Sequence, residues 1–143
     1  MMISLLLILQ TASAPLPRPL DSAQMEAIGC IATLGLVAYD QRRGDGAAQR
    51  FPDITERGKI YAGLLGDRIV FDSGQPKEVI ALAIRQSVAG QQEKAINAGS
   101  DAQRIAFIDG LMAKCLPLLD AEVPKKQDPE LQAPEPQEAE AKP

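Results

Sequence analysis

The two cysteines, Cys30 and Cys115, are the residues of this sequence whose chemistry is easiest to predict. A chain with only two cysteines that reaches an oxidising compartment most economically pairs them in a disulfide bond. That bond would close a loop around nearly the whole foldable region, and it would leave no thiolate for nucleophilic or metal chemistry. The alternative is a pair of buried, reduced thiols that pack as small hydrophobic side chains. We favour the disulfide.

Carboxylates are the other candidates for chemistry, because the sequence contains no histidine. The absence of histidine excludes Ser-His-Asp and Cys-His catalysis and zinc sites that use histidine. Asp67 and Asp72 bracket Arg68, and Asp40 and Asp45 bracket two further arginines. Such interspersed charges are typical of a solvated surface. We therefore predict no catalytic, metal-binding or cofactor-binding residue, while a carboxylate-based enzyme with an unlocated pocket stays an alternative.

The N-terminus favours export. An apolar run, Ile3–Leu9, is followed by Ala12-Ser13-Ala14, which is the pattern of a secretory signal peptide cleaved after Ala14. A membrane anchor is the alternative, but spanning a bilayer takes about 20 apolar residues, and Pro15 follows the run too early. We predict a periplasmic or secreted bacterial protein with no stable membrane span after cleavage.

The charge is unevenly distributed. Residues 15–120 carry 12 basic and 13 acidic side chains, whereas residues 121–143 carry 3 basic and 6 acidic ones. The foldable part therefore has no basic excess to attract nucleic acid, and the lack of Trp removes stacking platforms for single strands. The last stretch is rich in Pro, Glu, Ala and Gln, which predicts a disordered tail over residues 120–143.

Between these ends, the periodicity predicts four helices. The first begins at Asp21 with a capping box to Gln24, and the second follows a polar loop over residues 40–52 with Asp53 and Glu56 as a cap pair. The third begins with Pro76 at its first position, and the fourth begins after Ser100, which pairs with Gln103. The second is the weakest because it contains three glycines.

Three finer expectations concern packing within these helices. Gly29, Ala32 and Gly35 lie along one side of the first helix and suggest close approach by a neighbouring backbone. Tyr61 and Phe71 are predicted to be core residues. Pro117 is expected to end the fourth helix. The predicted organisation is a signal peptide over residues 1–14, a Pro-rich lead-in over 15–20, one all-α four-helix bundle-like domain over 21–119, and the tail.

The predicted function follows mainly from what the sequence lacks. We expect a non-catalytic exported protein that binds another protein or an envelope component; the alternatives are a small-ligand carrier and the carboxylate-based enzyme. In outline the layout resembles small exported helical bundles with one disulfide, such as acid-activated periplasmic chaperones and some toxin-immunity proteins. This resemblance adds a chaperone-like or immunity-type function as a further alternative, although likeness of architecture does not carry function.

Overall fold

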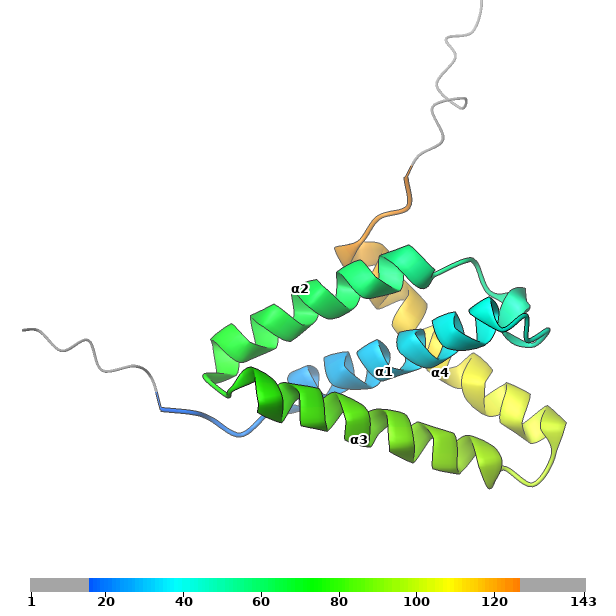
Figure 1. Ribbon diagram of the computed structural model, residues 1–143, viewed down its shortest axis with the longest axis horizontal. Helices are drawn as coiled ribbons and strands as arrows, with labels where there is room; N and C mark the ends of the chain where they lie inside the picture. Colours follow the sequence, from blue (N-terminus) through cyan, green and yellow to red (C-terminus); the bar gives the residue numbers. More distant parts are fainter. Residues whose placement is uncertain (1–15, 127–143) are drawn as a thin grey trace, which may run out of the picture.

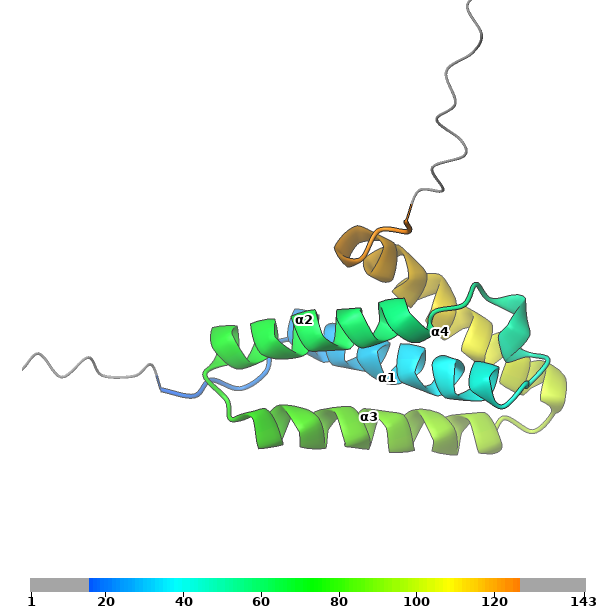
Figure 2. The ribbon, with the colours of Figure 1, turned by 45° about the horizontal axis from the view of Figure 1, so that its top comes forward.

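The computed structural model describes residues 16–126, and this part of the chain is all-α, as predicted. Its elements are α1 (Ser22–Arg42), a short 3-10 helix η1 (Ala48–Arg50), α2 (Thr55–Ser73), α3 (Lys77–Ile96) and α4 (Asp101–Glu122). The first three α-helices run side by side in alternating directions, and α4 crosses them at a steep angle (Figures 1 and 2). The predicted signal peptide and most of the predicted tail lie outside the described residues.

Helix α1 occupies the centre of the bundle and begins as the sequence indicates. The Gln24 amide donates to the Asp21 carboxylate at 2.8 Å, and the Asp21 amide donates to the Gln24 side chain at 3.0 Å, which confirms the capping box. By length and composition α1 could cross a membrane, but a core helix passes the same test. It contributes seven buried residues to the bundle, and it ends before Gly44, whose φ is +76°.

Helix α2 is continuous through its glycines. Its buried side chains, Tyr61, Leu65, Ile69 and Ser73, recur every four residues and face the core. The Thr55 amide donates to the Asp53 carboxylate at 2.9 Å, whereas Glu56 pairs with a lysine, so the predicted cap pair forms only in part.

Phe71 corrects one expectation about the core. Its side chain is 85% exposed, whereas Tyr61 is 1% exposed as predicted. Two residues correspond to about 200° of helical rotation, so Phe71 points away from the core that its near neighbour Ile69 enters.

Helix α4 corrects a second expectation, because it continues through Pro117 to Glu122 and past the predicted domain end at residue 119. Proline cannot donate to the carbonyl of Ala113, but both residues are exposed, so water can hydrate that carbonyl. Leu119, on the following turn, is fully buried and favours continuation. The helix that the proline was expected to end is therefore held by contacts beyond it.

The glycines of α1 do not serve close backbone approach. A methyl group built on Gly29 or Gly35 would meet no atom of a neighbouring element within 4 Å, so that expectation is wrong for both. Ala32 of the same set is buried. These two glycines lower the helix propensity of α1, and no close contact within the described structure requires them.

Candidate functional site

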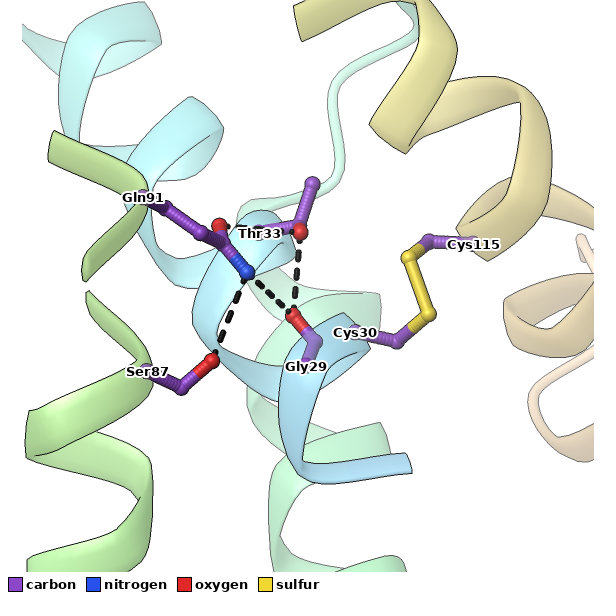
Figure 3. The surroundings of a disulfide bond; sticks show 6 residues. All are labelled: Gly29, Cys30, Thr33, Ser87, Gln91 and Cys115. Carbon is purple, nitrogen blue, oxygen red and sulfur yellow. Dashed lines mark hydrogen bonds between the residues drawn. A yellow bond between two sulfur atoms is a disulfide. The ribbon is translucent and has the colours of Figure 1, made fainter. Parts of the chain in front are cut away.

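The disulfide predicted between Cys30 and Cys115 is confirmed, with the two Cα atoms 5.3 Å apart. It joins α1 to α4 (Figure 3), and each cysteine is 3% exposed. Both lie in a core cluster that includes Tyr61 and Leu119. Because both cysteines of the chain are bonded and buried, no thiolate is available for nucleophilic or metal chemistry. The bond is structural.

The opposite side of α1 is joined to α3 by hydrogen bonds (Figure 3). The Gln91 side-chain amide donates to the Gly29 carbonyl at 3.0 Å and to Ser87 Oγ at 3.4 Å. Thr33, 1% exposed, has its hydroxyl 2.9 Å from the Gly29 carbonyl and 3.0 Å from Gln91 Oε1. These polar atoms satisfy one another, which favours a role in packing over catalysis. No local sequence pattern indicates this cluster, because its residues on α1 and on α3 are about sixty residues apart.

Asp40 and Asp45 are the candidate carboxylates that the fold brings together. They line a cavity of about 80 Å³ at the end of α1, with Arg50 and Arg104 and apolar side chains around them. Burial and, secondarily, the Asp45 charge raise the pKa of Asp40. Asp45 itself accepts hydrogen bonds from two backbone amides of η1 and its N-cap. The cavity is far below the roughly 300 Å³ of a small-molecule site, so it has room for a few waters and not for a substrate.

Asp67 and Asp72 do not form a site. Asp67 lies 3.5 Å from the ammonium of Lys77, and Arg68 binds Glu122 of α4 at 2.7 Å. The residues that the structure describes also contain no group of three or more side chains able to hold a metal ion.

A groove with a volume of about 650 Å³ lies between α1 and α2. The groove is lined by the first two turns of α1 and the second half of α2. The end of α4 crosses near the other half of α2 (Figures 1 and 2). The apolar lining residues of the groove are Pro19, Ala23, Ala27, Leu65 and Ile69, and its charged lining residues are Arg18, Asp21, Arg68 and Asp72. We call this surface the α1–α2 groove.

The lead-in segment shapes one end of the α1–α2 groove. The Arg18 amide donates to the Ser73 carbonyl at 2.8 Å, and the Gln75 side chain donates to the Arg18 carbonyl at 2.8 Å. The Arg18 guanidinium also donates to the backbone carbonyl of Asp72. These bonds hold the chain before α1 against the α2–α3 turn and fix Arg18 at the rim.

A second apolar surface lies on the outer face of α2. Ile60, Leu64 and Phe71 are 51%, 47% and 85% exposed, and their spacing places them on one helix face. Leu16, 85% exposed, lines a shallow depression together with Phe71.

Comparisons with protein-family models, with curated proteins and with solved structures found no match to this chain.

Proposed function

We propose that this chain is a non-catalytic exported protein that binds an amphipathic helix of another protein of the cell envelope in the α1–α2 groove. The observation that carries the proposal is the groove itself, which is open and is lined by apolar side chains and by charges of both signs. A groove of this composition fits the apolar face of a helix, with the rim charges contacting polar residues on either side.

The small residues of the groove lining set how closely a partner helix can approach α1. Ala23 and Ala27 project only methyl groups from α1, while Leu65 and Ile69 supply larger apolar surface from α2. A helix lying between them would bury its own apolar side chains against both. Because the rim carries both signs of charge, we expect the partner helix to carry acidic and basic residues beside its apolar face.

Export is part of the proposal. The disulfide fits an oxidising compartment, and the predicted signal peptide fits the same destination. Mass spectrometry of protein recovered from the periplasm or medium checks this, and we expect a chain that begins at or near Pro15. Recovery of a chain that still begins at Met1 or Met2 would contradict cleavage.

The alternatives have less support. A carboxylate-based enzyme at Asp40 and Asp45 would need a substrate-sized cavity, and the cavity beside them measures about 80 Å³. A small-ligand carrier would have to use the α1–α2 groove, which is an open depression and not an enclosed cavity. A chaperone-like or immunity-type protein would also bind another protein. The identity of that partner would distinguish a chaperone-like function from an immunity-type function.

The test is whether partner capture depends on the groove. We would compare co-purification from envelope extracts by the mature protein, by Ala23→Glu and by Ala106→Glu, which lies on an exposed face of α4. Ala23→Glu places a charge in the groove lining, so we expect it to abolish capture of any partner that wild type and Ala106→Glu retain. Equal capture by all three proteins would contradict the proposed site.

A further inference from the structure

The last six residues of α4, Pro117–Glu122, and the C-cap residue Val123 follow a weak point in the helix. Pro117 has no amide hydrogen, so the carbonyl of Ala113 receives no helical hydrogen bond from it. The hydrogen-bond ladder is therefore interrupted between the first part of α4 and its end. We call residues 117–123 the α4 end segment.

The upstream side of this weak point is fixed. Cys115 is bonded to Cys30, and Met112 is fully buried one turn earlier. Any movement of the α4 end segment therefore stops at Cys115, because the disulfide holds the rest of the helix on α1.

The downstream side is held by two arginines of α2. Arg57 donates from Nε to the Val123 carbonyl at 2.9 Å and from its terminal nitrogen to Asp120 at 2.5 Å. Arg68 makes two bonds to the Glu122 carboxylate, at 2.7 and 2.9 Å. Within the α4 end segment, Leu119 is the fully buried side chain. Val123 is partly buried against the same core cluster, and the Arg57 side chain is 16% exposed. A segment held by one fully buried side chain, one partly buried side chain and two arginines opens more readily than the whole domain unfolds.

The α4 end segment packs against the core cluster that borders the α1–α2 groove. Leu119 belongs to the same core cluster as Tyr61 and Leu65, and Ala27 packs against that cluster. Ala27 and Leu65 also line the groove. Displacing Leu119 would therefore uncover apolar surface that is continuous with the groove lining.

We propose that the α4 end segment opens as one unit, hinged at Pro117 and stopped by the disulfide, and that its opening lengthens the α1–α2 groove toward Tyr61. The second half of this inference rests on the proposed function. The segment then regulates how much of a partner helix the groove accepts, because the closed segment occupies the place of its last turns.

Hydrogen exchange of the mature protein at neutral pH tests the opening directly. We expect the amides of residues 118–123 to share one protection factor, at least tenfold below that of the buried turns of α4 around Met112. Arg57→Gln and Arg68→Gln each remove the contacts of one arginine with this segment. Each variant should therefore speed hydrogen exchange in the segment severalfold and leave exchange in α3 unchanged. Pro117→Ala restores the missing donor and should slow exchange in the segment.

Arg50→Gln is the matched control. Arg50 also pairs with a carboxylate of α4, binding Asp109 at 2.9 Å, but it does so upstream of Cys115. Its replacement should leave exchange at residues 118–123 unchanged. Protection that falls gradually toward Val123 would mean simple end fraying and would overturn the hinge, as would an equal effect of Arg50→Gln. The exchange experiment needs no partner, so a segment that stays shut leaves the groove proposal standing.

Discussion

Removing the disulfide is the perturbation whose effect on stability follows most directly from the structure. Cys30 and Cys115 are separated by 85 residues. The chain-entropy relation for a loop of that length gives about 4.5 kcal/mol of stabilisation at 25 °C, and measured values for native disulfides fall at about 2–5 kcal/mol. We expect Cys30→Ala and Cys115→Ala each to lower the free energy of unfolding by an amount within that range.

The two losses should not add. Either replacement removes the same constraint on the unfolded chain, so the double variant should be about as stable as each single variant. Urea unfolding followed by far-UV circular dichroism measures all three, and the denaturant slope should rise because the unfolded chain without the bond exposes more surface. Additive losses with an unchanged slope would mean that the cysteines act as independent core residues, which would refute the reasoning.

Three further predictions concern stability. Gly35→Ala should stabilise the protein by about 0.5–1 kcal/mol in urea unfolding, because Gly35 lies within a helix and has open space around it. Gly74→Ala should destabilise the protein, because Gly74 has a φ of +68°, which alanine adopts only with strain. Hydrogen bonds from their arginine partners lower the pKa values of Asp120 and Glu122. The stabilisation that these ionised carboxylates give the folded state is therefore present above about pH 4.5 and should be lost as pH falls below about 4. Replacing the arginines should make the free energy of unfolding less dependent on pH in this range. Removing residues 127–143 should leave the thermal midpoint within about a degree or two of that of the full chain. Removing residues 122–143 should lower the midpoint clearly, because Arg68 then loses the Glu122 carboxylate and Arg57 loses the Val123 carbonyl.

The features that could be predicted from the sequence are those set by neighbouring residues or by elimination. The capping box at Asp21 and Gln24 depends on residues three apart, so its signal is local and it is confirmed. The pairing of Cys30 with Cys115 followed because the chain offers no other cysteine. The four helices followed from the recurrence of apolar residues at helical spacing.

The features that could not be predicted depend on contacts between distant residues. A local rule ends a helix at Pro117, but Leu119 is buried and Arg57 binds the helix end from more than sixty residues away. Phe71 has the residue type of a core position, and only its rotation relative to Ile69 shows that it faces outward. The α1–α2 groove is lined by residues of two helices and of the lead-in, an arrangement that no single segment of sequence encodes.

Site-specific photo-cross-linking in the producing cell tests the proposed binding site most directly. A photoreactive amino acid would replace Ala23, which lines the groove, or Ala106, which lies on the exposed face of α4 as the control. Our account predicts a covalent adduct with a second protein from position 23 and none from position 106, with the cross-linked peptide belonging to an amphipathic helix. Absence of an adduct at position 23, or the same adduct at both positions, would contradict a partner helix in the α1–α2 groove.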